Sequence, residues 1–212
     1  MVSETARIGV IICSSRQPRV CPQIAQFVVQ TIESTSLRSN DAGPCLELID
    51  LFKWNLPMFD EPDLPSQITD HYQYKHAHTR AWSEEVQRYH AFIFVVPQYN
   101  WGYPAVVKNA IDYLYSEWKG KPAMVVSYGG HGGSKCNAQL TEVLRGVRMV
   151  PTTQSVELTF PNRGVLVKAV KGEDISFDDT SESDVWQVGR QHITAAYSEL
   201  LQMLVGTNVQ SN

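Results

Sequence analysis

An eight-residue segment, Pro97 to Pro104 (PQYNWGYP), combines the side-chain types that suit a flat aromatic ligand. Tyr99 and Trp101 offer ring surfaces for stacking. Gln98 and Asn100 offer amide donors and acceptors that can orient such a ring. We therefore expect a binding site that includes Pro97, Gln98, Tyr99, Asn100 and Trp101. The alternative is a hydrophobic turn that packs under the edge of a sheet.

A polar loop near the start of the chain is a second candidate, in this case for an anion. Arg7 to Cys13 is short and β-branched, which is typical of a buried strand, and Ser14 to Arg19 follow it. Hydroxyl groups, two guanidinium groups and the start of a helix together favour a bound phosphate. The expected ligands are the side chains of Ser14, Arg16 and Arg19 and the backbone amides near Val20 and Cys21. A solvated basic loop with a helix cap is the alternative.

A glycine-rich segment, Ser127 to Gly133 (SYGGHGG), is the third candidate. Four glycines in five positions are costly in conformational entropy, and that cost is understandable where amide N–H groups must approach a ligand closely. The residues expected to take part are Ser127, Tyr128, Gly129, Gly130 and Gly133. A flexible loop tip is the alternative, and His131 fits either interpretation.

Strands and helices that alternate along the chain must position these three segments. The predicted strands are Arg7 to Cys13, Leu46 to Leu51, Ala91 to Val96, Ala123 to Val126 and Ser155 to Leu158. The predicted helices are Pro22 to about Ile32, Thr79 to Tyr89, Ala105 to Tyr115, Ala138 to Val147 and Val185 to Leu204. This order predicts an α/β fold in which a doubly wound, five-stranded parallel sheet forms a three-layer α/β/α sandwich. All three candidate segments then lie at the carboxyl edge of the sheet, where such folds bind ligands.

The segments between these elements also have distinct characters. Asn40 to Pro44 is predicted as a turn. Lys53 to His78 is unusually long, and its aromatic residues favour an ordered loop that folds back on the domain. Glu173 to Asp184 is acidic and is predicted to be a solvated loop. The chain, residues 1–212, has no internal repeat and is expected to be a single domain.

The composition excludes several functional classes. The net charge is −4 and no run of Lys or Arg occurs, so we expect no nucleic-acid partner. No apolar stretch reaches the length of a transmembrane helix, so no membrane association is expected. The four cysteines lack disulfide-dense or CxxC spacing, which favours reduced thiols and a cytoplasmic location. His71, His76 and His78 have no cysteine nearby, and no metal site is expected.

With these motifs, the sequence resembles the NADPH-dependent FMN reductase family, which includes fungal and bacterial NAD(P)H:quinone reductases. The likeness extends from Arg7 to Phe160. Its most specific parts are three stretches: PQYNWGYPAVVKNAIDYLY (97–115), KGKPAMVVSYGGHGG (119–133) and LPMFDEP (56–62). The resemblance implies a flavodoxin-like fold, FMN bound without a covalent link, and a homodimer.

The resemblance also implies a role for each loop. The family's Gly-Ser-x-Arg loop, which holds the FMN phosphate, corresponds to residues 13–16, with Cys13 in place of the first glycine. The Pro-Glu-Tyr-Asn loop that supports the flavin ring corresponds to residues 97–100, with Gln98 in place of the commoner Glu. The Gly-Gly turn that contacts the pyrimidine end of the flavin corresponds to Gly129 and Gly130.

The activity implied by the resemblance is a two-step, ping-pong oxidoreduction. NADPH or NADH gives a hydride to N5 of FMN, and a quinone or similar small acceptor then takes two electrons. The chemistry is centred on the flavin, so no catalytic side chain is expected.

Two alternatives remain open from the sequence. One is a flavodoxin-like FMN-binding electron carrier or redox-responsive partner protein, which would have the same fold. The other is a tyrosine phosphatase of low molecular weight, because Cys13 and Arg19 have Cys-x5-Arg spacing after the first strand.

Overall fold

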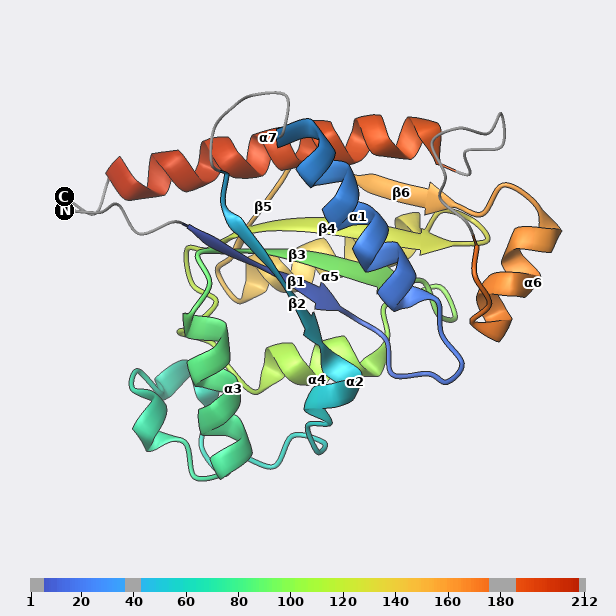
Figure 1. Cartoon of the computed structure of the whole chain (residues 1–212). Coiled ribbons are helices and arrows are strands. Elements are labelled where there is room, and N and C mark those ends of the chain that lie inside the picture. Colours follow the sequence, from blue (N-terminus) through green and yellow to red (C-terminus); the bar gives the residue numbers. More distant parts are fainter. Residues whose placement is uncertain (1–5, 37–42, 176–185, 210–212) are drawn as a thin grey trace.

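The computed structural model of the chain describes residues 6–36, 43–175 and 186–209. The strands of its sheet are β1 (Arg7–Ile12), β2 (Cys45–Asp50), β3 (Ala91–Pro97), β4 (Pro122–Gly129), β5 (Val150–Pro151) and β6 (Val156–Thr159). All pairings are parallel, in the order β2-β1-β3-β4-β5, and β6 pairs with β4 as well. The predicted doubly wound α/β fold is confirmed (Figure 1).

Helices cover both faces of the sheet. The α-helices are α1 (Cys21–Ser36), α2 (Leu51–Trp54), α3 (Ala77–Gln87), α4 (Ala105–Asp112), α5 (Ser134–Gly146), α6 (Arg163–Lys171) and α7 (Gln187–Val209). Two short 3-10 helices, η1 (Pro65–Gln67) and η2 (His71–Gln73), lie within the long loop that precedes α3. Figure 1 shows α1 and α7 on one side of the sheet and α3 and α4 on the other.

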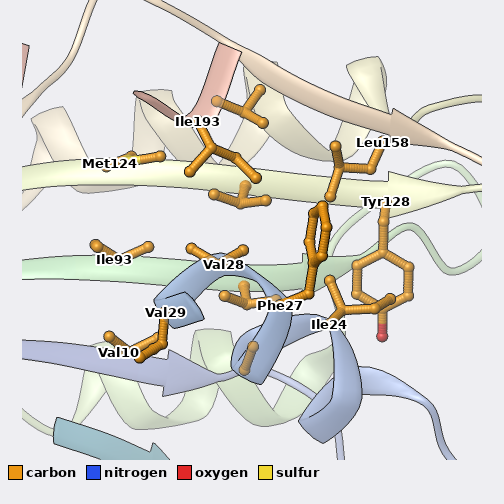
Figure 2. Packing of buried hydrophobic residues seen from close by; sticks show 14 of the residues in the cluster. Val10, Ile24, Phe27, Val28, Val29, Ile93, Met124, Tyr128, Leu158 and Ile193 are labelled. Atoms are coloured by element: carbon orange, nitrogen blue, oxygen red, sulfur yellow. The ribbon is translucent and has the colours of Figure 1, made fainter. Parts of the chain in front are cut away.

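Strand β3 shows how one sequence run builds two cores. All seven of its residues are buried, and its side chains alternate between the two faces. Ile93 and Val95 join the core under α1 and α7, which Figure 2 shows from close by. Phe92 and Phe94 join the second core, under α3, α4 and α5. The continuous apolar run therefore marks a central strand that is covered on both faces.

The structure also corrects the predicted elements. The sheet has six strands because Val150–Pro151 adds a short strand, β5, beside the start of β4. β4 continues to Gly129, so the first part of the glycine-rich segment is strand and not loop. Two helices were not predicted: α2, and α6 between β6 and α7. α1 extends four residues beyond Ile32, to Ser36.

Several sequence predictions fall partly on residues outside the described ranges. Most of the predicted turn Asn40 to Pro44, most of the acidic segment Glu173 to Asp184 and the expected start of the last helix lie there. Among the described helices, none combines the length and the apolar character that crossing a bilayer requires.

Candidate functional site

The three segments singled out from the sequence meet at the carboxyl edge of the sheet. They enclose a cavity of about 120 Å³. The loop after β1 contributes Arg16, Arg19 and Val20, the end of β3 and its following turn contribute Pro97, Gln98 and Tyr99, and the end of β4 contributes Tyr128, Gly129 and Gly130. The parallel order β1-β3-β4 brings them together, since adjacent parallel strands end at the same edge.

The Ser14 hydroxyl is the most unusual polar group of this site. It is fully buried, at the start of the loop after β1, and makes no hydrogen bond. Burial raises the pKa of Tyr99, and the nearby Ser14 hydroxyl lowers that pKa in part. The two side chains are close to each other, but their atoms do not have the geometry of a hydrogen bond. A buried hydroxyl without a partner costs about 1–3 kcal/mol, so Ser14 is suited to a partner from outside the protein.

The two arginines of this loop have different surroundings. Arg19 Nη1 and Nη2 donate to the two carboxylate oxygens of Asp50 at 2.8 and 2.7 Å, and Nη1 also donates to the Ser14 carbonyl oxygen at 2.8 Å. The hydrogen bond with Asp50 raises the pKa of Arg19. Arg16 is exposed, and its guanidinium carbon lies 4.7 Å from the centre of the Tyr99 ring. Arg19 therefore shapes the loop, whereas Arg16 presents its charge to solvent.

The turn after β3 holds two residues in left-handed backbone conformations. Asn100 has φ 49° and Trp101 has φ 68°, and Tyr99 and Gly102 exchange two backbone hydrogen bonds of 2.9 and 3.0 Å across them. The Gln139 side chain donates to the Trp101 carbonyl oxygen at 3.3 Å. A bulky residue at positive φ is strained, and such strain clusters at functional sites.

The strained turn presents an aromatic surface beside the cavity. The Trp101 side chain is exposed, and its ring lies parallel to that of His131, with centres 5.8 Å apart and 7° between the planes. His131 belongs to the glycine-rich segment, so the two loops contribute one ring each. Neither ring lines the cavity, so the predicted site residue Trp101 lies next to it and, with His131, presents an aromatic surface to solvent.

The glycines of the third segment serve two purposes. Gly132 and Gly133 have φ 75° and 89°, and a Cβ at Gly133 would lie 2.9 Å from the Ser127 Cβ. These two positions need glycine for the fold itself. A Cβ at Gly129 or Gly130 would meet no atom closer than 3.6 Å. Their bare backbone is therefore not needed for packing and leaves room beside the cavity.

Some predicted site residues lie behind the cavity and support it. The Ser127 hydroxyl is buried and donates to the carbonyl oxygens of Gly132 and Val156 at 3.3 and 3.2 Å. The Cys21 thiol is buried and donates to the Val95 carbonyl oxygen at 3.3 Å. Gly133 is the residue that precedes α5.

Tyr128 lines the cavity as a neutral wall. Its side chain is buried, and this burial raises the pKa of its hydroxyl well above the usual range. The group keeps its proton at any physiological pH. Figure 2 shows Tyr128 at the end of the core that lies under α1.

The chemistry of Cys13 contradicts the phosphatase alternative. Its thiol is fully buried and donates to the Ile11 carbonyl oxygen at 3.4 Å. Burial raises the pKa of this thiol well above its ordinary value, whereas a nucleophilic cysteine needs a lowered one. The arginine at the required spacing, Arg19, is paired with Asp50.

Four residues of the cavity wall were missed from the sequence: Phe160, Leu166, Ala169 and Val170. Phe160 directly follows β6, at the same sheet edge as the three loops. The other three lie on α6 at i, i+3 and i+4, a spacing that places them on one face of a helix. That spacing was the available signal.

The long loop before α3 is ordered but does not line the cavity. Its Phe59 amide donates to Asn109 Oδ1 at 2.9 Å, and Asn109 Nδ2 donates to the Pro57 carbonyl oxygen at 2.7 Å, which fixes the loop against α4. His76 and His78 stack beside Asp60. In the described part of the chain, no three His, Cys, Asp or Glu residues are grouped so as to hold a metal ion.

Comparison with known proteins identifies relatives of the chain. Residues 6–162 match the family model described as NADPH-dependent FMN reductase. The NAD(P)H-dependent FMN reductase LOT6 of Saccharomyces cerevisiae is 50% identical over 145 residues, which cover 68% of this chain and 75% of the relative. The NAD(P)H-dependent FMN reductase C4B3.06c of Schizosaccharomyces pombe is 41% identical over 173 residues, 82% of each chain.

The fold is also found in solved structures. The flavoenzyme FerB, an NAD(P)H:(acceptor) oxidoreductase of Paracoccus denitrificans, superimposes with a TM-score of 0.66 at 19% identity, over 94% of this chain and 99% of that one.

Proposed function

The chain belongs to the NADPH-dependent FMN reductase family, and we propose that it binds FMN at the cavity described above and uses NADPH or NADH to reduce a small acceptor such as a quinone. We propose further that the whole chain acts as one domain. The observation that carries the proposal is the convergence of the three loops on one cavity at the carboxyl edge of the sheet.

The residues present fit FMN in chemical type. The Ser14 hydroxyl lacks a partner, Arg16 carries an exposed charge, and both precede α1, which suits a phosphate group. The bare backbone of Gly129 and Gly130 leaves room for a ring to approach. Gln98 Oε1 accepts from the Cys136 amide at 3.2 Å, which fixes this side chain at the cavity wall.

When bound, FMN supplies the two-electron chemistry that links NAD(P)H to the acceptor. The protein binds and orients the cofactor and shields it from water. Ser14 and Arg16 hold the phosphate, Arg19 keeps their loop in shape, and Tyr128 closes the inner wall without exchanging a proton. None of these roles requires a nucleophilic side chain.

The stacked pair Trp101 and His131 supports a planar acceptor, and a quinone is such a molecule. We propose that the nicotinamide and the acceptor use this exposed side of the site in turn, which gives ping-pong kinetics. Initial rates at several quinone concentrations should then give parallel double-reciprocal lines. Intersecting lines would show that donor and acceptor bind together.

Substitution of Arg16 tests the position of the site. Because a hydrogen bond to a charged group contributes about 1.5–3 kcal/mol, Arg16→Ala should weaken FMN binding roughly 10- to 150-fold. The readout is the quenching of FMN fluorescence during titration of the apoprotein. Arg145→Ala, which removes an exposed arginine from α5, is the matched control and should bind FMN like wild type. Equal affinities for all three proteins would reject the proposed phosphate site.

An anaerobic titration distinguishes the reductase from an electron carrier. The FMN-loaded protein should lose its visible absorption with NADPH or NADH and recover it with benzoquinone over many turnovers. A carrier would bind FMN but would not react with either nicotinamide.

The quaternary state and location are further parts of the proposal. We propose a homodimer in the cytoplasm, on the basis of the family resemblance and of four free cysteines, three of them buried. Sedimentation at micromolar concentration tests the dimer.

A further inference from the structure

Helix α6 lies just outside the segment that matches the family model, yet it forms part of the cavity wall. The match ends at residue 162, and α6 begins at Arg163. Leu166, Ala169 and Val170 line the cavity from the same face of this helix. Figure 1 shows α6 beyond the carboxyl ends of β4 and β6. The cavity wall therefore includes a helix that lies outside the three loops and outside the matched segment.

The amino-terminal end of α6 is tied to the glycine-rich segment. The Phe160 amide donates to the Gly129 carbonyl oxygen at 3.2 Å, and Asn162 Oδ1 then caps the helix by accepting from the Val165 amide at 3.0 Å. Leu166 lies one turn further on, and its Cδ2 would be 3.8 Å from a Cβ at Gly130. This end of α6 thus faces the bare backbone of the third loop.

The carboxyl-terminal end of α6 is tied to the loop after β1, where the FMN phosphate is proposed to bind. Gly172 ends the helix with φ 68°, and a Cβ there would lie 3.0 Å from Pro18 Cβ and 3.1 Å from the Arg19 amide. Gln23 Nε2, in the first turn of α1, donates to the carbonyl oxygens of Gly172 and Glu173 at 3.4 and 3.1 Å. The helix therefore crosses the cavity from the third loop to the first.

The size of the cavity shows what this arrangement means for a ligand. Its volume of about 120 Å³ is below the roughly 300 Å³ at which small-molecule sites begin. Of the ten other lining residues, three lie on strands, namely Pro97, Tyr128 and Gly129, and the rest lie in the segments that follow strand ends. α6 is outside the sheet, and Val170 at the rim is 52% exposed. The cavity opens to solvent at this rim, so a ligand the size of FMN would fill it and extend outward along this face of α6.

We propose that α6 is a wall of the FMN site, whose Leu166, Ala169 and Val170 face contacts the bound cofactor and slows its release. This inference rests on the proposed position of FMN. It assigns part of the cofactor affinity to a helix that the family's motifs do not include. The apolar face shields the cofactor from water, and the loss of its contacts would speed the dissociation of FMN.

Paired substitutions on α6 test the proposal without an activity assay. Leu166→Ala and Val170→Glu change the cavity face. Val167→Ala and Val167→Glu are the matched controls, because Val167 is 43% exposed on the same helix and does not line the cavity. The measured quantities are the dissociation constant of FMN and its association and dissociation rates, from stopped-flow quenching of FMN fluorescence by each apoprotein.

The expected results differ between the two faces. Since several buried methylene-sized groups are lost, Leu166→Ala should weaken binding about tenfold, mainly through faster dissociation. Val170→Glu, at a half-exposed position that tolerates a polar residue, should weaken binding at least as much. Both Val167 variants should stay within about twofold of wild type.

Two failures are distinguishable. If the cavity-face variants behave like the Val167 controls while Arg16→Ala weakens binding, then α6 does not contact FMN and the inference is overturned. If Arg16→Ala also has no effect, the position of the site itself is wrong. Thermal unfolding of each apoprotein shows whether a change in FMN affinity reflects loss of the fold. If Leu166→Ala unfolds, Val170→Glu still decides the question, because Val170 is half-exposed and its substitution disturbs the fold less.

Discussion

Ser14 and Thr79 are the two side chains in the described ranges whose buried polar atoms have no hydrogen-bond partner. Their positions differ. Thr79 lies on α3, remote from the three loops, whereas Ser14 begins the loop that borders the cavity. The comparison indicates that burial alone does not mark a binding residue. Ser14 is a candidate binding residue because it follows a strand end and lies two residues before the exposed Arg16.

This contrast leads to a prediction for Ser14→Ala. The substitution should weaken FMN binding about tenfold or more, because a hydrogen bond to a charged phosphate is lost. The free energy of unfolding of the apoprotein should stay the same or rise slightly, since no bond within the protein is broken. Urea unfolding and FMN titration measure the two quantities. Thr79→Val is the control and should leave FMN affinity unchanged. A less stable Ser14→Ala apoprotein with unchanged FMN affinity would assign Ser14 a purely structural role.

The sequence located the three loops but not the task of each residue within them. Position after a strand places Arg16 and Arg19 in the same loop, and both have the charge that a phosphate needs. Only the fold shows that Asp50, 31 residues further along the chain, takes up the Arg19 guanidinium. The buried hydrogen bonds of Ser127 and Cys21 were hidden for the same reason. Pairing over a long sequence separation decides which side chains remain for a ligand.

At the scale of elements, the Arg19–Asp50 pair joins the loop after β1 to the end of β2. Its side chains are only 8% and 10% exposed. Asp50→Asn should therefore destabilise the protein by about 3 kcal/mol, because it leaves the Arg19 charge buried and poorly compensated. Asp112→Asn is the control, since its pair with Lys108 on α4 is 42% and 40% exposed and should contribute less than about 0.5 kcal/mol. Urea unfolding of both variants checks this, and equal losses would contradict it.

Helix α6 was missed because its sequence is a poor helix former. RGVLVKAVK contains three valines and a glycine, which favour strand or loop over helix. The signals that mark it are at its ends, where Asn162 caps the first turn and Gly172 takes the left-handed conformation that ends a helix. β5 has only two residues and leaves no periodic pattern at all. Strand β3 was predictable because a strand that is buried on both faces is apolar at every position, which leaves a continuous apolar run in the sequence.

Lys121, just before β4, gives the structure a pH dependence. Its ammonium group donates to the Val86 carbonyl oxygen at 2.7 Å, and burial lowers the pKa of Lys121 from 10.5 to about 8, against the opposing effect of Glu117. Between pH 8 and 10.5 the folded protein has released this proton while the unfolded chain still holds it. Stability should therefore rise with pH across this window by up to about 3 kcal/mol.

The measurement is the difference in unfolding free energy between wild type and Lys121→Met at several pH values. Taking the difference removes the contribution of the tyrosines, which titrate in the same range. Wild type should gain relative to the variant from pH 8 upward. A difference that does not change with pH would mean that Lys121 keeps its charge in the folded protein.

For the whole molecule, the parallel topology explains why a sequence reading could reach the site at all. Once strands and helices alternate, the carboxyl ends of β1, β3 and β4 must meet, whatever the details of packing. The two cores lie under the sheet faces, and both are composed of the protein's own side chains. Most of both cores lies away from the cavity, and a few residues of the first core, such as Tyr128 and Ala169, reach its wall.

This division predicts how FMN and folding are linked. The apoprotein should unfold cooperatively, because nearly all residues of the two cores pack against each other and not against the cavity. FMN at 100 times its dissociation constant should add about 2.7 kcal/mol, which corresponds to a rise in Tm of roughly 5–10 °C for a chain of this length. At the same FMN concentration, Arg16→Ala should show a smaller rise from an unchanged apoprotein Tm. An apoprotein without a cooperative transition would show instead that the cofactor is part of the core. The conclusion that FMN binds at the edge of a sheet that folds without it would then be wrong.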